Sequence, residues 1–258
     1  MEPRIIFEDE NLLVVDKPAG VIVNKADSAK GFVTLQDWVE TKFAIQKSKK
    51  LSDQEKSKYI VDGYNKYDEF ISRSGIVHRL DKETSGIILI AKNPETFVNL
   101  QNQFKSGIVS KTYTTLVHGK VENKTGEIDA PIGRLPWNRM RFGVFPEGRS
   151  AQSEYKVLSY KQHATGKTQE ILTLVEVYPK TGRTHQIRVH FQYLKHPVFG
   201  DELYAGRKTG RLDRQDLDRH FLHASKIHII HPTTNLATDF ESTLPDSLSI
   251  FLNKLTDA

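Results

Sequence analysis

The feature that most constrains the fold is a set of strand-like segments in the middle of the chain. Residues 111–118, 153–160 and 169–178 are rich in β-branched and aromatic side chains, and glycines such as Gly119 and Gly166 separate them. Such segments, joined by glycine turns, are typical of strands that pair with their neighbours in the chain. The sequence therefore predicts an extensive, mainly antiparallel sheet.

Helices are predicted around this sheet. Asn93 and Pro94 supply an N-cap and a proline at the first helical position, and Gly107 supplies the stop. Other patterns predict helices at 34–43, 184–194 and 244–255, a hairpin within 5–15 and a strand at 222–230. No repeat or flexible linker divides the chain, so we expect one α+β domain over residues 1–258, built on a large mixed, mainly antiparallel sheet flanked by helices. The polar, lysine-rich stretch 46–69 is interpreted as a solvated insertion, helical or mobile.

Composition excludes several classes of protein. The absence of cysteine rules out disulfides, thiolate zinc sites and a cysteine nucleophile, and fits a reducing cytoplasm. No apolar run approaches the roughly 20 residues of a membrane helix, so we expect a soluble protein without membrane contact. The 37 basic residues against 32 acidic ones give a net charge of +5. This modest excess favours a polyanionic partner.

One acid stands in an unusual setting. Asp81 lies in the run His78–Gly86, between cations and just before the apolar stretch Ile87–Ala91, which needs burial. This position predicts a carboxylate held at the rim of the core, where a reactive acid belongs. A local cap or ion pair at Asp81 explains the same residues equally well.

An arginine also stands on an apolar stripe. The helix predicted at 184–194 places Thr184, Ile187, Arg188 and Phe191 on one face, at i, i+3, i+4 and i+7. A partly buried guanidinium stays charged and needs a carboxylate partner. Asp81 is a candidate from a distant part of the chain, and a purely structural salt bridge would serve the same need.

The run around Asp81 resembles the signature of the RluA-type pseudouridine synthases, in which the catalytic aspartate of His-Arg-Leu-Asp precedes Thr-Ser-Gly. The match to His78-Arg79-Leu80-Asp81 is letter for letter. The resemblance implies an enzyme that converts uridine in structured RNA, ribosomal or transfer, to pseudouridine. It also implies that Asp81 is catalytic, either as a nucleophile or by helping to abstract a sugar proton, and that no cofactor or metal is used.

Two further motifs carry the resemblance. Lys111-Thr112-Tyr113 resembles the family's Lys-x-Tyr element, and Thr181–His190 contains its Gly-Arg-Thr-His-Gln-Ile-Arg stretch. The resemblance implies that Tyr113 stacks on the target base, although a tyrosine on a strand is by itself more typical of core packing. It also implies that Arg188 pairs with the catalytic aspartate and that Ile187 lines the pocket.

Shorter matches extend the resemblance over about residues 5 to 232. They comprise Lys17–Gly20, Pro131–Gly133, His196–Asp201 with Tyr204, and Leu222–Ala224. The chain departs from the family where Asn24-Lys25 replaces a common histidine and where the 46–69 insertion lengthens the distance from Gly20 to His78. We also expect the chain to lack the amino-terminal RNA-binding domain of the S4 type that many members of this family carry.

The target base must leave its stack, and Arg79 is the candidate to occupy the vacated position, although it could equally pair with a phosphate or carboxylate. A loop mixing arginines with aromatic residues suits phosphate contact and base stacking, or else is a solvated loop anchored by its aromatics. Its members are Arg134, Arg139, Arg141, Arg149, Trp137, Phe142 and Phe145. The substrate-binding candidates are thus Arg79, His78, Ile187, Arg183, Arg139 and Arg141. We expect a monomer.

Three other functions are alternatives to pseudouridine synthesis. A noncatalytic RNA-binding protein with this fold would be expected to lack an aspartate or arginine that is present here. A metal-dependent hydrolase could use His78, Asp81, His185 and His190, but a five-residue step places the last two about 140° apart on a helix. A nucleotide-binding enzyme is suggested by Gly166-Lys167-Thr168. The phosphate loop also requires a glycine five positions earlier, and Lys161 occupies that position, so this motif is excluded.

Overall fold

The computed structural model describes residues 2–25, 31–43, 51–165 and 168–258. The chain forms two compact units, one of Met1–Val109 with Lys226–Ser242 and the other of Ser110–Ser225 with Thr243–Ala258. The prediction of one domain over residues 1–258 stays a prediction. None of the helices in the described ranges is long and apolar enough to cross a membrane.

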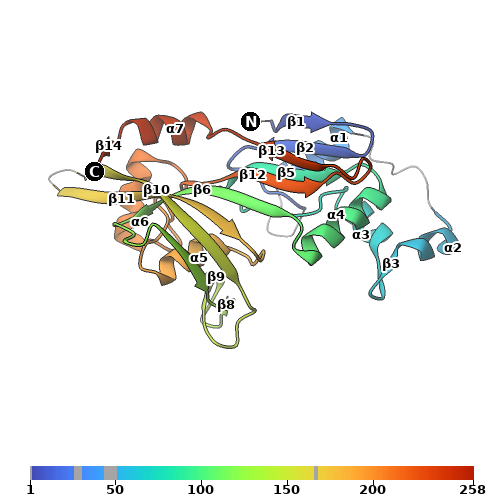
Figure 1. Cartoon of the computed structure of the whole chain (residues 1–258), viewed down its shortest axis with the longest axis horizontal. Coiled ribbons are helices and arrows are strands. Elements are labelled where there is room, and N and C mark those ends of the chain that lie inside the picture. The colour runs from blue at the N-terminus through green and yellow to red at the C-terminus, as the bar shows by residue number, and fades with distance from the viewer. Residues whose placement is uncertain (1, 26–30, 44–50, 166–167) are drawn as a thin grey trace. The chain divides into compact units, whose positions relative to one another are not determined.

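The first unit is built on antiparallel strands (Figure 1). β2 (Leu12–Lys17) pairs with β1 (Arg4–Glu8) on one side and with β5 (Ser85–Ala91) on the other. All seven residues of β5 are buried, as expected for a central strand whose two faces are both covered. The chain returns to this unit through the later part of β12 (Leu222–Ile230), which pairs with β13 (Ala237–Glu241). The predicted amino-terminal hairpin and the strand at 222–230 are confirmed.

Local signals fix the helices of the first unit. Helix α4 (Pro94–Ser106) begins after the Asn93 cap and ends at Gly107, whose φ of 77° is the left-handed value that favours glycine. The predicted helix at 34–43 is α1 (Leu35–Lys42), which a Thr34 capping box starts. Both predictions are confirmed.

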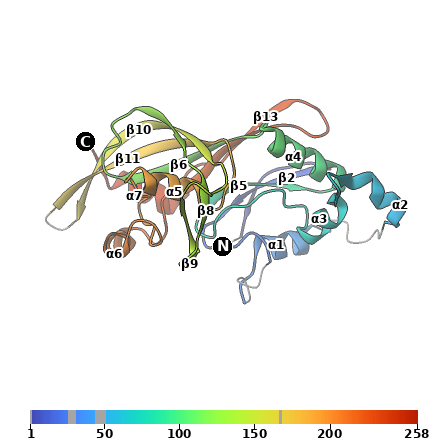
Figure 2. The same ribbon diagram turned by 90° about the horizontal axis from the view of Figure 1, so that it is seen from below.

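The insertion has its own secondary structure. Its residues 46–50 lie outside the described residues. The rest forms α2 (Asp53–Lys56), the 3₁₀ turn η2 (Ser57–Tyr59), the hairpin β3 (Ile60–Val61) with β4 (Tyr64–Asn65), and the start of α3 (Lys66–Ser72). Helix α3 lies beside α4 (Figure 2), and their phenylalanine rings, Phe70 and Phe97, meet edge to face at 5.7 Å between centroids.

The second unit contains the three strands predicted in the middle of the chain. β11 (Thr168–Pro179) pairs with β6 (Ser110–His118) and β10 (Gln152–Thr165), all antiparallel. β7 (Thr125–Asp129) and β14 (Thr256–Asp257) also pair with β10, and β8 (Ile132–Leu135) forms a separate hairpin with β9 (Asn138–Val144). Three helices complete the unit: α5 (Gln186–Tyr193), α6 (Arg207–Asp216) and α7 (Asp246–Asn253). The α+β class and the dominance of antiparallel pairing are confirmed.

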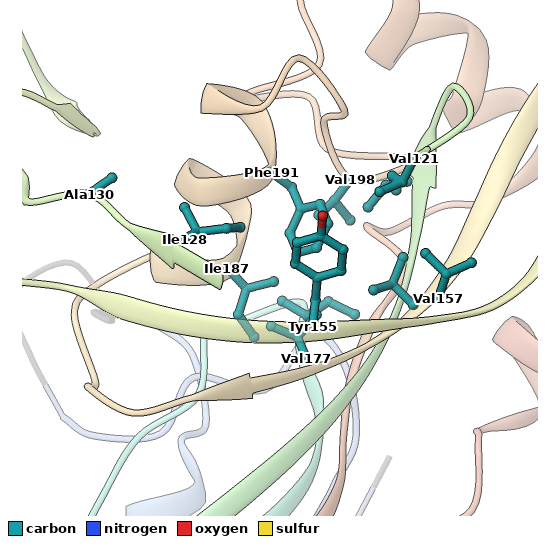
Figure 3. Close-up of a cluster of buried hydrophobic side chains, with 12 residues drawn as sticks. Val121, Ile128, Ala130, Tyr155, Val157, Val177, Ile187, Phe191 and Val198 are labelled. Carbon is teal, nitrogen blue, oxygen red and sulfur yellow. The ribbon is translucent and has the colours of Figure 1, made fainter. Parts of the chain in front are cut away.

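Alternating side chains give the sheet two apolar faces over the strands of the second unit. Val117 of β6 belongs to a buried cluster that includes Ile187 and Phe191 of α5, and Figure 3 shows these two α5 side chains in it. Its neighbour Leu116 points the other way and packs with Phe251 of α7. Helices α5 and α7 therefore cover opposite faces of this sheet (Figure 1).

A buried histidine ties α6 to the strands. His118, at the end of β6, lies 2.8 Å from a Glu170 oxygen through Nδ1 and 2.9 Å from an Asp213 oxygen through Nε2. Burial opposes a charge on this ring, but the two hydrogen bonds raise the pKa of His118 to about 9. The imidazolium and the two carboxylates thus form an ion cluster that joins β6, β11 and α6.

Two helix boundaries differ from prediction. The helix expected at 184–194 begins at Gln186, so Thr184 precedes it and does not share its face. His185 interrupts the pattern with a φ of 58°, which helical periodicity does not reveal. The helix expected at 244–255 spans Asp246–Asn253, because the chain leaves it to pair as β14.

Candidate active site

The aspartate motif lies along the central strand of the first unit. Ile76 forms an antiparallel bridge with Ile90 of β5, and the Val77 amide donates to the Leu89 carbonyl at 3.4 Å. Both Ile76 and Val77 are buried, whereas Asp81, beyond the end of this pairing, is partly exposed. The predicted position of Asp81 at the rim of a buried strand is confirmed.

A buried lysine holds the backbone next to Asp81. Lys17 is fully buried, and its Nζ donates to the carbonyl oxygens of Pro18 at 2.9 Å, Val21 at 2.9 Å and Lys82 at 3.2 Å. These bonds disperse a charge that would otherwise be costly to bury. The Lys-Pro-x-Gly element therefore joins the chain segment around residue 20 to the loop that carries Asp81.

Backbone hydrogen bonds fix the same loop. The Gly20 amide donates to the Lys82 carbonyl at 2.8 Å, and the Thr84 amide donates to the Asp81 carbonyl at 3.1 Å, closing a turn. Gly20 has a φ of 87°, and this left-handed conformation directs its amide to Lys82. The backbone of Asp81 is thus held by the turn that follows it and by a separate segment of the first unit.

His78 and Arg79 face different surroundings. The Leu89 amide donates to Nε2 of His78 at 2.9 Å, so that nitrogen carries no proton, and the ring lies 5.0 Å from that of Phe104. These contacts anchor the motif to β5 and α4. The Arg79 side chain is exposed and has no ionic partner among the described residues.

Tyr113 and Ile187 come together in the second unit. Tyr113, on β6, is partly buried and packs against the cluster that contains Ile187, whose exposed fraction is 5%. Figure 3 shows Ile187 of α5 next to Val177, the β11 residue that pairs with Tyr113. The two residues thus share one face of the sheet, and their roles toward a base stay predictions.

Arg188 has a carboxylate partner within its own unit. Its Nε donates to Asp201 Oδ2 at 2.6 Å and its Nη2 donates to Asp201 Oδ1 at 2.9 Å. Arg188 and Asp201 are 7% and 1% exposed, so this is a buried bidentate ion pair. The expectation that Arg188 needs a carboxylate is confirmed with Asp201, and a pairing with Asp81 stays a prediction.

The ring of Tyr204 is in contact with two arginines, Arg141 and Arg188. The Arg141 and Arg188 guanidinium carbons lie 5.4 Å and 5.0 Å from the centroid of its ring. Its hydroxyl accepts a hydrogen bond from the Phe142 amide at 3.0 Å and lies 2.9 Å from Nδ1 of His185. The β8–β9 hairpin, the start of α5 and the segment after it are therefore tied together at one phenol.

His185 is the most unusual backbone position of the site. A non-glycine residue in the left-handed region is uncommon, and such strain gathers at functional sites. The Tyr204 hydroxyl and the edge of Phe142, 5.5 Å away between ring centroids, hold the imidazole. This conformation turns the chain sharply into α5, so that Arg188 follows one turn later.

Arg183 and Arg139 lie on loop and strand segments of the same unit. Nε of Arg183 donates to the Ser150 carbonyl at 2.9 Å, and its amide donates to Oε1 of Gln186 at 2.9 Å. Burial, together with the nearby charge of Arg149, lowers the pKa of Arg183. Arg139 is part of β9, and its side chain lies outside the described part of the structure.

No set of three or more potential ligands that could hold a metal occurs among the described residues. His190, which the metal-site alternative used, instead contacts Ser153 Oγ at 3.0 Å and the Ala130 carbonyl at 3.1 Å. Burial lowers the pKa of His190, which favours the neutral ring.

From the sequence, three residues of this site could be identified only as members of matched segments, with no role of their own: Lys17, Asp201 and Tyr204. A buried lysine, an acid and a tyrosine in such segments have no periodic signal that reveals their partners. For Asp201, the arginine on the α5 stripe was the available signal, since a buried guanidinium requires a carboxylate somewhere in the chain.

Known proteins are similar to this chain in sequence and in fold. A family model described as RNA pseudouridylate synthase matches residues 11–193. The uncharacterized RNA pseudouridine synthase YlyB of Bacillus subtilis is 34% identical over 99% of this chain and 73% of its own length. The ribosomal large subunit pseudouridine synthase D of Nitrosomonas europaea is 35% identical over 98% of this chain and 65% of its own length. Both curated relatives are thus longer than this chain.

A solved structure agrees with the sequence comparison. The human RNA pseudouridylate synthase domain containing 1 superposes with a TM-score of 0.70 and 25% identity, covering 97% of this chain and 87% of the other. The family model covers more than half of the chain, and the motifs it spans include the fixed loop of Asp81. The chain therefore belongs to the RluA-type RNA pseudouridine synthases, isomerases that convert uridine in RNA to pseudouridine.

Proposed function

We propose that this chain isomerises specific uridines in large-subunit ribosomal RNA, with Asp81 as the catalytic carboxylate. The observation that carries the proposal is the loop of Asp81, fixed by buried Lys17 and by the Gly20 amide at the rim of β5. The name of the Nitrosomonas europaea relative, which refers to the ribosomal large subunit, supports the choice of RNA.

The reaction rearranges bonds without net change in composition. The bond from uracil N1 to the sugar C1′ breaks, the base rotates, and a bond forms between C5 and C1′. The hydrogen on C5 passes to solvent and N1 gains a proton. Asp81 would begin the reaction either by attacking C1′ or by helping to abstract a sugar proton, and both routes need an ionised carboxylate.

Arg188 is proposed as the cation that keeps this carboxylate ionised. A guanidinium carries five N–H donors, and the pair with Asp201 uses two of them, one on Nε and one on Nη2. Asp201 thereby fixes the plane of the guanidinium. An oriented cation near a carboxylate lowers the free energy of the charged form.

Tyr113 is proposed to stack on the target uracil, with Ile187 as part of the apolar wall beside it. Their shared cluster in the second unit supports this role, because a flat apolar surface with a phenol suits a base removed from its stack. Flipping the base costs a few kcal/mol, which stacking in the pocket would offset.

The arginines are proposed to bind the RNA around the flipped nucleotide. Arg79 would fill the vacated position, and its exposure without an ionic partner in the described residues supports this. Arg139, Arg141 and Arg183 would contact the RNA, while His78 would support the motif from behind through its bond with the Leu89 amide. We further propose that the enzyme needs no cofactor, acts as a monomer and works in the cytoplasm.

The test is release of tritium from RNA labelled at uridine C5, measured on transcripts of large-subunit ribosomal RNA and transfer RNA. The proposal predicts release from the large-subunit transcript. Release from transfer RNA alone would contradict the proposed substrate. Tight binding by a folded protein with no release from either transcript would instead favour a noncatalytic RNA-binding protein that retains the fold.

A further inference from the structure

Three cations gather at one corner of the second unit without carboxylate partners. The corner is formed by the start of β6, the segment before β10 and the turn after β11. Nζ of Lys111 donates to the Thr181 carbonyl at 3.2 Å. Arg183 lies two residues after Thr181 on that turn. Its Nε donates to the Ser150 carbonyl, and this bond brings its guanidinium beside Arg149. In the described part of the chain, no ion pair involves any of these three cations.

The acids and a further lysine of this corner are already engaged. Nζ of Lys180 lies 2.9 Å from a Glu154 oxygen, and the Glu127 carboxylate accepts a hydrogen bond from the side chain of Gln152. Lys180 is therefore a neutralised neighbour, whereas Lys111 contacts only a carbonyl. Hydrogen-bond donors remain on each of the three cations.

This arrangement is unfavourable for the free protein. Burial lowers the pKa of Lys111 to about 8, which shows that its ammonium is poorly solvated. The nearby charge of Arg149 acts against that of Arg183. A buried ammonium and two guanidinium groups that repel each other are expected to gain more from a bound anion than cations already paired with carboxylates.

We propose that Lys111, Arg149 and Arg183 form a binding site for a phosphate of the RNA backbone. The inference rests on the proposed function for its ligand, since RNA is the polyanion that this family acts on. Lys111 and Tyr113 are two residues apart on one strand, so they share a face and are separated by roughly 6.6 Å of strand rise. The phosphate bound here would belong to the same segment of RNA as the flipped uridine.

The corner is held in shape by uncharged groups. Thr181 Oγ1 donates to Oε1 of Gln186 at 2.7 Å and accepts from the Gln152 amide at 3.1 Å. Nε2 of Gln186 donates in turn to the Gln152 carbonyl at 2.9 Å. These bonds fix the turn that carries Arg183 and Thr181, the acceptor of the Lys111 ammonium, without using any of the three cations.

The experiment measures binding of a single-stranded, uridine-containing RNA to the full chain as a function of salt concentration. Lys111→Met is compared with the control Lys180→Met, which removes a cation already paired with Glu154. For Lys111→Met we expect about a tenfold loss of affinity, equivalent to ~1.4 kcal/mol, and a salt slope shallower by about 0.7. Its thermal unfolding midpoint should not fall, because an unfavourably buried charge has been removed.

Arg149→Gln provides a second variant, since Arg149 is exposed and its loss leaves the fold undisturbed. It should also flatten the salt dependence. Wild-type affinity and slope in both Lys111→Met and Arg149→Gln would overturn the site, as would an equal loss in Lys180→Met. Because binding is measured separately from tritium release, altered binding in a chain that releases no tritium would refute the proposed function and retain the phosphate site.

Discussion

Asp201→Asn tests whether the buried pair with Arg188 is both a stability element and a positioning element. In the native protein Asp201 Oδ1 accepts from Nη2 of Arg188 and from the Leu203 and Tyr204 amides at 3.0 Å and 3.2 Å. Oδ2 accepts from Nε of Arg188 at 2.6 Å. An asparagine that keeps its oxygen toward the two amides must point its NH₂ group at the Nε–H donor.

The substitution therefore places donor against donor and removes the negative charge of Asp201 from a buried guanidinium. Breaking a buried ion pair in this way destabilises proteins by about 3–5 kcal/mol. At roughly 2–4 °C per kcal/mol for a chain of this size, the unfolding midpoint should fall by roughly 6–20 °C. Differential scanning calorimetry measures the shift. Glu154→Gln, which removes an exposed pair with Lys180, is the control and should cost less than about 1 kcal/mol.

A double-mutant cycle separates the pair from its surroundings. In Asp201→Asn with Arg188→Gln, two neutral amides can hydrogen-bond, so the double variant should be more stable than the sum of the two single losses predicts. Additivity within about 0.5 kcal/mol would refute the reasoning. If Asp201 positions Arg188, the single variant should also lose up to about 100-fold in kcat for tritium release while KM changes little.

Three other perturbations follow from the structure. Lys17→Met removes the ammonium that bonds three carbonyl oxygens, of which only that of Lys82 keeps a described backbone donor, the Gly20 amide. The variant should destabilise the fold by roughly 3 kcal/mol and slow tritium release, and an unchanged melting temperature would contradict the role of the lysine. His118 has a folded pKa of about 9 against an ordinary value of 6.5, so its stabilisation, up to roughly 3 kcal/mol, is fully present below pH 6.5 and is lost as pH rises through 9. Urea unfolding at both pH limits should show this loss in the wild type and not in His118→Gln. Gly200→Ala would place a Cβ 2.3 Å from a backbone oxygen, at a residue whose φ is +76°. It should lower the free energy of unfolding by more than about 1 kcal/mol. Gly182→Ala, whose Cβ meets nothing within 4 Å, is the control and should not show this loss.

The parts of the fold that local chemistry decides were predictable from sequence. Helix α4 has its cap, its first-turn proline and its terminal glycine within the element itself, so both ends were predicted closely. The strands β6, β10 and β11 were predicted because their residues need a pleated, half-buried surface. Their register depends on partners far along the chain, as in the pairing of Tyr113 with Val177, and no local pattern predicts it.

The site was predictable only in part, for the same physical reason. Asp81 was recognised because its motif is contiguous, and Arg188 because a charge on an apolar stripe demands an explanation. The partner of Arg188 could not be identified from the sequence, since a buried arginine requires a carboxylate but does not specify which one. The delayed start of α5 depends on the left-handed backbone of His185, which the distant Tyr204 hydroxyl contacts.

The central claim is that Asp81 carries out the chemistry at the sugar of the target uridine. The most direct measurement is single-turnover release of C5 tritium from the identified RNA by the wild type and by Asp81→Asn, at protein concentrations that saturate binding. Asparagine preserves the size of the side chain, so RNA affinity and the melting temperature serve as controls. The account predicts that the variant binds RNA and releases no tritium above background, and full release by Asp81→Asn would contradict it.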